Sequence, residues 1–408
     1  MKKLVLRAVS LLVIVALLFS ATPYLVKACM PEYNEAVGNG TDDQKIKGLY
    51  LLKESAALRD NVIVYGSSEL RTEYISSHPA NFFAGERTGF QINLIGRGSC
   101  QSIIHAMSIA ASGDSLNNSP VVLITSPQSY VEGGITPDMF FANFSKQQYI
   151  TIMYDSSVSQ SVKTRLSKRV CEMFERYDEK FGKLSGYEDI RALAKMGAGE
   201  GFACVAAKTV TAPFFMFERL MEDNRDMIKS AEIINNASVN QKELSKDIDW
   251  KKEYALAEET AKKEATNNDF GMRDADYKKN VGNKLSRFKD RDKNLSYDNS
   301  VEYDDLQLLL DICVEKGIRP LFVSVPLHGE WSDYTGFTKD KRMSYYNKVE
   351  SYVAPYCEKY GFEFLDLSGY EYEKYFLCDT MHLGWKGWLK VNEEIDAFYL
   401  RYHGENLQ

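Results

Sequence analysis

Short runs of apolar residues mark five segments of the chain as candidate strands. They occupy residues 61–65 (NVIVY), 90–95 (FQINLI), 121–125 (VVLIT), 320–325 (PLFVSV) and 362–367 (FEFLDL). Continuous apolar runs of this length are typical of strands that are buried on both faces of a parallel sheet. Helical patterns lie between several of them, for example over 100–111 and 303–316. Strands alternating with helices predict an α/β fold in which helices flank a parallel sheet.

A long polar stretch separates the first three candidate strands from the last two. Residues 145–300 are mostly helical in pattern and include the charged amphipathic segment 247–264. No heptad is sustained long enough to require a coiled-coil arm, so we predict a helical insertion that covers the sheet. The expected division is 29–145 and 301–408 for the two parts of the α/β domain, with 146–300 as the insertion.

The amino terminus has the pattern of a membrane anchor. Lys2, Lys3 and Arg7 precede an uncharged run over 8–26, which is close to the length needed to span a bilayer. The basic flank places residues 1–7 in the cytoplasm and the rest of the chain outside, so residues 1–28 are predicted to be a cytoplasmic tip and a single anchor in the cell membrane. A cleaved signal peptide, or lipidation at Cys29, is the alternative. Each reading puts the globular part outside the cytoplasm.

Charge and cysteine usage exclude some classes of function. The formal net charge is −7, which argues against a nucleic-acid partner because phosphate binding requires a basic face. The seven cysteines contain no CxxC or CxxxC pair, so no metal site is predicted. No cofactor motif is present either, since the GRGS of residues 96–99 lacks the rest of a phosphate-binding fingerprint.

The first candidate for chemistry directly follows the first strand. Residues 65–70 read YGSSEL, and ligands of open α/β sheets bind beyond the carboxyl ends of the strands. A serine at such a turn can lie at the start of a helix, where free N–H groups stabilise a developing oxyanion. Ser68 is therefore a candidate nucleophile, although Ser67 and Ser68 can equally serve as helix caps.

The second candidate lies before the last helical segment. Residues 378–382 read CDTMH, and an Asp and a His three positions apart on a turn can lie side by side. The carboxylate of Asp379 would then orient the His382 imidazole and stabilise its protonated form. A helix-capping Asp beside an incidental His is the alternative.

Taken together, the two motifs resemble the chain order of the SGNH hydrolases. That resemblance implies an SGNH/flavodoxin-like fold with Ser68 as nucleophile and Asp379 and His382 as its base. The loop after the second strand falls where the class places an oxyanion-hole glycine, so Gly98, or Gly96 beside it, is the predicted donor. The class has an asparagine after the third strand, where this chain reads TSPQSY, and Gln128 is the predicted substitute.

Several further motifs resemble the DltD family over nearly the whole chain. They are GSSEL (66–70), LIGRGSCQS (94–102), SPQSY (126–130), FGMRDADYKK (270–279), VPLHGEWSDYTG (325–336) and DTMH (379–382). Two positions depart from the family pattern. His328 stands where an asparagine is expected and Ser129 where an aromatic residue is expected. The resemblance therefore does not determine which residues form the wall of the site.

The resemblance implies an extracytoplasmic serine acyltransferase that esterifies lipoteichoic acid with D-alanine. It also implies a D-alanyl carrier protein and a membrane acyltransferase as partners. The D-alanyl ammonium needs an acceptor, for which Glu69 is the nearest carboxylate in sequence, while His328 is a candidate for the pocket wall. Three alternatives remain open at this point: an esterase or thioesterase with the same triad, a non-catalytic adaptor for the carrier protein, and a transferase or esterase for carbohydrate O-acetyl groups.

Overall fold

The computed structural model describes residues 24–84, 88–199, 201–238 and 248–405, with Arg7, Ser10, Ile14, Leu17 and residues 20–22 before them. Within these residues five strands form one sheet: β1 (Asn61–Tyr65), β2 (Gln91–Ile95), β3 (Val121–Thr125), β4 (Leu321–Ser324) and β5 (Glu363–Asp366). All pairings are parallel and the order is β2-β1-β3-β4-β5, as in flavodoxin-like sheets. The predicted parallel α/β sheet is confirmed, and each predicted strand overlaps an observed one.

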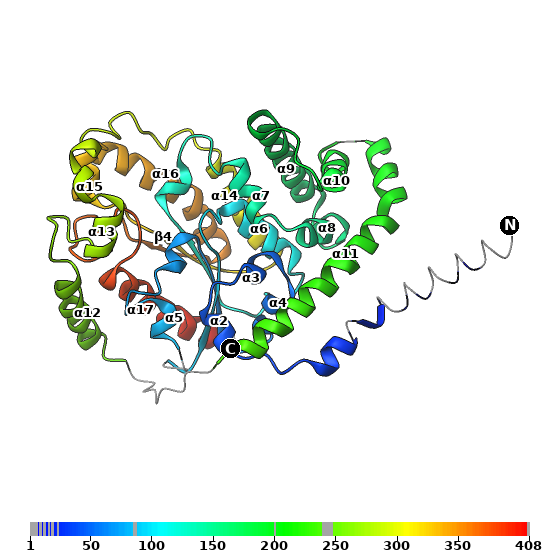
Figure 1. The fold of residues 1–408 in the computed structure, drawn as a ribbon, viewed down its shortest axis with the longest axis horizontal. Helices are drawn as coiled ribbons and strands as arrows, with labels where there is room; N and C mark the ends of the chain where they lie inside the picture. The colour runs from blue at the N-terminus through cyan, green and yellow to red at the C-terminus, as the bar shows by residue number, and fades with distance from the viewer. Residues whose placement is uncertain are drawn as a thin grey trace.

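Helices account for most of the remaining structure (Figure 1). In chain order they are α2 (Ala36–Asn39), α3 (Asp43–Lys47), α4 (Tyr50–Ala56), α5 (Pro79–Phe82), α6 (Ser102–Ala111), α7 (Pro137–Asn143), α8 (Lys146–Tyr154), α9 (Gln160–Phe181), α10 (Glu188–Ala198), α11 (Phe202–Asn236), α12 (Trp250–Glu264), α13 (Asp274–Asn280), α14 (Glu302–Glu315), α15 (Gly329–Thr335), α16 (Lys339–Tyr360) and α17 (Trp385–Glu405). Short 3-10 helices are η1 (Ser68–Arg71), η2 (Pro127–Tyr130), η3 (Gly282–Phe288) and η4 (Ser368–Tyr370).

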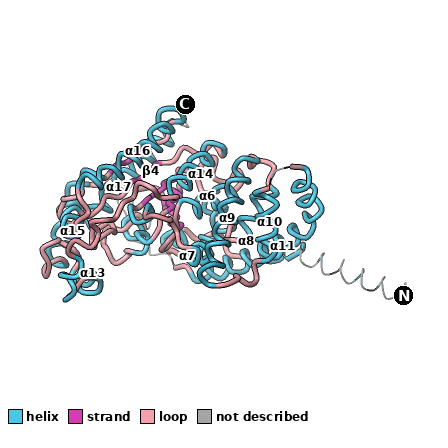
Figure 2. The backbone as a smooth tube through the Cα atoms, turned by 90° about the horizontal axis from the view of Figure 1, so that it is seen from above, coloured by secondary structure: helices cyan, strands magenta, loops and turns pink. Residues whose placement is uncertain are grey.

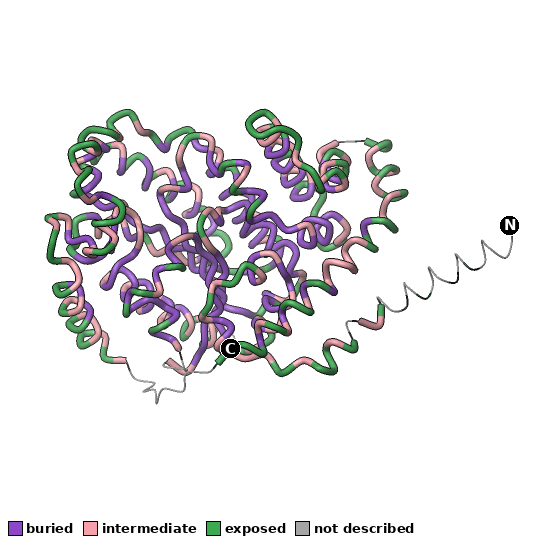
Figure 3. The backbone as a smooth tube through the Cα atoms, viewed as in Figure 1, coloured by how far each residue is buried: buried purple, intermediate pink, exposed green. Residues whose placement is uncertain are grey.

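Alternating side chains of the strands enter two separate hydrophobic cores. In β1, Ile63 and Tyr65 pack into the core built with α6, α8, α14 and α16, whereas Val62 and Val64 pack against α5, α12 and α17. Successive side chains of a strand point to opposite faces, so a sheet covered on both sides needs an apolar residue at every position. Figure 3 shows the buried segments concentrated around this sheet.

The predicted insertion is helical, but it does not form one cap. Helices α9, α10 and α11 lie on one side of the molecule, and α12 and α13 lie on the opposite side (Figures 1 and 2). Helix α8 packs against α6, and α12 packs against α17, so both groups extend the helical layers of the sheet. The boundaries 29–145, 146–300 and 301–408 remain a prediction.

The predicted membrane anchor over residues 8–26 lies largely outside the described residues. In the parts of the chain that the structure does describe, no helix is both long enough and apolar enough to cross a bilayer. The anchor therefore rests on the pattern of the sequence alone.

The loops at the carboxyl ends of β1 and β2 approach each other closely. Gly96 has a φ of +154°, and a Cβ atom built on it would lie 1.8 Å from the carbonyl oxygen of Gly66. No other residue fits there without moving the backbone. This contact brings the loop of residues 96–99 next to the turn that carries Ser68.

Candidate active site

Three side chains that are far apart in sequence meet at the carboxyl edge of the sheet. The Oγ atom of Ser68, at the start of η1, lies 2.8 Å from Nε2 of His382. The other ring nitrogen of His382, Nδ1, lies 2.7 Å from Oδ2 of Asp379. The structure thus brings together the three residues that the sequence predicted as a triad, in the order hydroxyl, imidazole, carboxylate.

Hydrogen bonds within the loop between β5 and α17 fix the positions of Asp379 and His382 relative to each other. Oδ1 of Asp379 accepts the backbone N–H groups of Met381 and His382, both at 2.8 Å. The N–H of Cys378 donates to the carbonyl of His382 at 2.9 Å and closes the turn. Because the carboxylate accepts a hydrogen bond from Nδ1–H and so keeps the ring proton on Nδ1, the lone pair of Nε2 faces Ser68 and can take its proton.

The environment of this pair favours its ionised form. Burial by itself would lower the pKa of His382, but the hydrogen bond and negative charge of Asp379 outweigh it and raise the pKa above its ordinary value. For Asp379, burial would raise the pKa, whereas the hydrogen bond and charge of His382 and two backbone N–H groups lower it. An imidazole with a raised pKa is a stronger base for the serine hydroxyl.

Glu69 lies beneath the nucleophile and is fully buried. Its Oε1 accepts the backbone N–H of Ser67 at 2.5 Å, and its Oε2 accepts the hydroxyl of Ser126 at 3.3 Å. Burial raises its pKa, although the Ser67 N–H opposes the shift. These contacts join the turns after β1 and β3. The position of Glu69 therefore favours a role in holding the nucleophile turn, and not the predicted role in binding a substrate.

We expect Glu69→Ala to destabilise the fold by about 1–3 kcal/mol, because the buried N–H of Ser67 loses its acceptor. The measurement is the free energy of unfolding from a denaturant titration. Glu73→Ala is the matched control, since Glu73 lies in the same loop but is only half-buried, and it should change stability by less than about 0.5 kcal/mol. Equal values for the two variants would contradict this role of Glu69.

Of the two predicted oxyanion donors, Gln128 contacts the nucleophile directly. The Nε2 amide of Gln128, in η2 after β3, donates to Oγ of Ser68 at 3.3 Å. Gly98 lies in the loop after β2, where its carbonyl accepts from Nδ2 of Asn143 at 3.3 Å. The same asparagine accepts from Nε of Arg97 at 2.6 Å, so this loop is fixed beside the nucleophile turn. Donation by the Gly98 N–H remains a prediction.

His328 uses both ring nitrogens for contacts within the protein. It caps α15 by accepting the N–H of Trp331 on Nδ1 at 3.4 Å, and its Nε2 donates to the carbonyl of Phe270 at 3.0 Å. Burial lowers its pKa to about 4, so the ring is neutral at pH 7. The histidine thus holds the loop before α13 against α15, and its predicted place in the wall of the site remains a prediction.

The sequence did not single out three polar residues beside the triad. Arg273 donates its backbone N–H to the carbonyl of Cys378 at 2.7 Å, and its guanidinium lies 4.4 Å above the ring of Tyr74. Its Nη1 also lies 3.3 Å from Oδ2 of Asp276. The motif FGMRDADYKK contains Arg273 and Asp276 and was the available signal, but their i,i+3 spacing by itself is common on helix surfaces.

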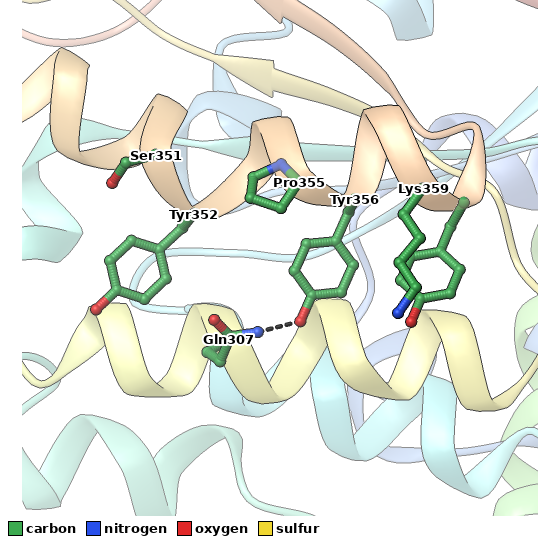
Figure 4. A pocket seen from close by; sticks show the side chains of 7 residues that line it. Gln307, Ser351, Tyr352, Pro355, Tyr356 and Lys359 are labelled. Carbon is green, nitrogen blue, oxygen red and sulfur yellow. Dashed lines mark hydrogen bonds between the residues drawn. The ribbon is translucent and has the colours of Figure 1, made fainter.

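A separate cavity of about 520 Å³ lies between α14 and α16 (Figure 4). Its lining consists of Gln307 from α14 and of Ser351, Tyr352, Pro355, Tyr356, Lys359 and Tyr360 from α16. The side-chain amide of Gln307 donates to the hydroxyl of Tyr356 across it. None of Ser68, Asp379 and His382 lines this cavity, so its volume does not mark the position of the candidate active site.

Comparison with known proteins identifies the family. A family model described as DltD protein matches residues 39–400. The chain is 32% identical over 354 residues to Protein DltD of Bacillus subtilis, covering 86% of each chain. It is 26% identical to Protein DltD of Staphylococcus aureus, over 86% of this chain and 84% of that protein. For Protein DltD of Lacticaseibacillus rhamnosus the identity is 28%, over 85% of this chain and 79% of that protein. With a match over most of its length and a relative above 30% identity, the chain belongs to the DltD family.

Proposed function

We propose that this protein is a serine acyltransferase that transfers D-alanine to lipoteichoic acid during teichoic acid D-alanylation. Membership of the DltD family supports the pathway. The distance of 2.8 Å between Oγ of Ser68 and Nε2 of His382 is the single observation that supports the mechanism. A hydroxyl at hydrogen-bond distance from a carboxylate-oriented imidazole is the arrangement used for covalent acyl transfer.

The proposed reaction has two half-reactions that use the same base. In the first, His382 takes the proton of Ser68 while Oγ attacks the carbonyl carbon of a D-alanyl thioester, and the thiol leaves with that proton. In the second, a polymer hydroxyl gives its proton to His382 and attacks the D-alanyl ester, and Ser68 leaves as the restored hydroxyl. The negative charge that develops on the carbonyl oxygen needs donors, for which Gln128 and the N–H of Gly98 are the candidates.

The location and partners form part of the same proposal. The apolar run over residues 8–26 would anchor the protein as a single-pass helix in the cell membrane, with the globular part outside the cytoplasm. The D-alanyl carrier protein and the membrane acyltransferase of the pathway would supply the acyl group. The net charge of −7 implies that an anionic polymer is bound by local contacts and not by general attraction.

Trapping the covalent intermediate tests this proposal. After incubation of the full chain with a D-alanyl thioester, we expect the peptide that contains Ser68 to gain the mass of one D-alanyl residue. Addition of lipoteichoic acid should then discharge it, with new D-alanyl ester on the polymer as the product. Release of free D-alanine without polymer ester would identify a thioesterase instead. A peptide that is never acylated would support the adaptor.

A further inference from the structure

A charged group beside the triad has no part in the reaction as described so far. Helix α13 begins against the loop of Asp379 and His382, because the N–H of Arg273 donates to the carbonyl of Cys378 at 2.7 Å. The residue bonded in this way directly precedes the triad carboxylate. Whatever α13 carries in its first turn is therefore held at a fixed position next to the base.

The guanidinium of Arg273, the N-cap residue of α13, lies between two carboxylates. Nη1 of Arg273 lies 3.3 Å from Oδ2 of Asp276, and its Nε lies 3.6 Å from Oε2 of Glu264 at the end of α12. The ring of Tyr74, 4.4 Å from the guanidinium, supports it from the side of the nucleophile turn. One guanidinium shared by two carboxylates leaves an excess of one negative charge in this group.

Asp276 is well shielded from water, and its charge acts on the active site. Its side chain is 13% exposed, so its field is only weakly screened. It is one of the carboxylates that favour the protonated form of the His382 ring, after the larger effect of Asp379. It also adds to the raised pKa of Tyr74, for which burial is the main cause. An additional cation beside these residues would be stabilised.

The two acidic residues closest to the triad in the motifs, Asp379 and Glu69, already have partners for their carboxylates. Asp379 binds two backbone N–H groups and the ring of His382 through its two oxygens. Glu69 is fully buried and binds Ser67 and Ser126. An ionised carboxylate has about four acceptor positions, and Asp276 retains capacity beside its contacts with Arg273 and Tyr74.

We propose that Asp276 provides the counter-charge for the ammonium group of the aminoacyl substrate. The inference rests on the proposed function, because only an aminoacyl group carries such an ammonium. Transfer requires a site from which water is kept away, and a cation in such a site is costly unless a carboxylate pairs with it. Arg273 and Tyr74 then act as positioning residues that hold Asp276 toward the triad.

The test compares two thioesters of the same small thiol, one with a D-alanyl group and one with a D-lactyl group. The two acyl groups have the same size, but D-lactyl carries a neutral hydroxyl where D-alanyl carries the ammonium. The full chain is used, and kcat/KM is measured for thiol release from each thioester. For Asp276→Asn we expect the ratio of D-alanyl to D-lactyl turnover to fall by roughly 10–100-fold, because any effect of the lost charge on His382 slows or speeds both substrates alike and cancels in the ratio.

Asp274→Asn is the matched control on the same helix. The Asp274 carboxylate accepts hydrogen bonds from Thr266 and Asn267, so its loss disturbs α13 without removing the proposed counter-charge. The ratio of the two substrates should stay the same in this variant. The ratio isolates charge recognition because a damaged helix would slow both substrates alike.

The possible outcomes separate the inference from the proposed function. If Ser68→Ala abolishes turnover while Asp276→Asn leaves the ratio unchanged, or slows both substrates equally, the inference fails and the proposed function stands. If the unaltered protein turns over neither thioester, or Ser68→Ala keeps full activity, both fail. A fall of the ratio in Asp276→Asn alone supports the assignment.

Discussion

Replacing Ser68 by alanine is expected to lower D-alanyl transfer to the polymer by roughly 10⁴-fold or more, because no other group can form the acyl ester. The hydroxyl is half-buried and its described partners are His382 and Gln128. Its removal therefore takes away the nucleophile with little effect on packing. The measurement is the rate at which D-alanyl ester appears on lipoteichoic acid with the full chain.

Ser67→Ala is the control for this experiment. The Ser67 hydroxyl donates to the carbonyl of Arg97 at 3.3 Å, and the loss of one such bond costs about 1 kcal/mol. We expect activity within about tenfold of the unaltered protein. If Ser68→Ala left cell-envelope D-alanine at its normal level, with the protein at normal abundance, the non-catalytic adaptor would be the correct interpretation.

Replacing Asp379 by asparagine is expected to reduce the rate by roughly 10³–10⁴-fold at neutral pH. Asparagine can still accept the N–H groups of Met381 and His382 through one oxygen, so the loop is retained. Its amide nitrogen, however, would face Nδ1 of His382 as a donor. The ring would then carry its proton on Nε2 and present a donor to Ser68, and it could no longer accept the serine proton.

The pH profile provides a second readout of the same substitution. His382 must be neutral to act as base, so activity rises as the pH increases through its pKa. Asp379 raises that pKa, so the midpoint for the unaltered protein lies above the ordinary value of 6.5. Without the Asp379 carboxylate, less negative charge opposes the lowering of the His382 pKa by burial. The residual activity of Asp379→Asn should therefore rise with a lower midpoint pH. A midpoint that moves upward would contradict the assigned role of Asp379.

The positions of the strands could be predicted because burial on both faces leaves a local signature. Residues 61–65 and 121–125 are apolar at nearly every position, and the structure places β1 and β3 at those bounds. The apolar runs extend past the assigned strands at Phe90, Pro320 and Val325. An apolar pattern reports burial, and these flanking residues are buried although they lie outside the assigned bounds.

The pairing of two motifs predicted which residues would meet, whereas the roles predicted for single residues such as Glu69 remain predictions. Ser68 and the Asp379–His382 pair follow strands whose carboxyl ends share one edge, which topology makes predictable. Glu69 was assigned by its proximity in sequence to Ser68. Its side chain is instead buried beneath the turn, where it accepts the Ser67 N–H and the Ser126 hydroxyl.

The sequence by itself determined the α/β class, the strands, the order of the motifs and the family resemblance, because each depends on local pattern. Only the tertiary structure decided which charges face the triad. Asp276 and Arg273 lie in the motif FGMRDADYKK, whose sequence alone assigns them no role, and a hydrogen bond to Cys378, about a hundred positions later in the sequence, brings them to the base. Side-chain electrostatics depend on distance in space, and a single sequence does not encode that distance locally.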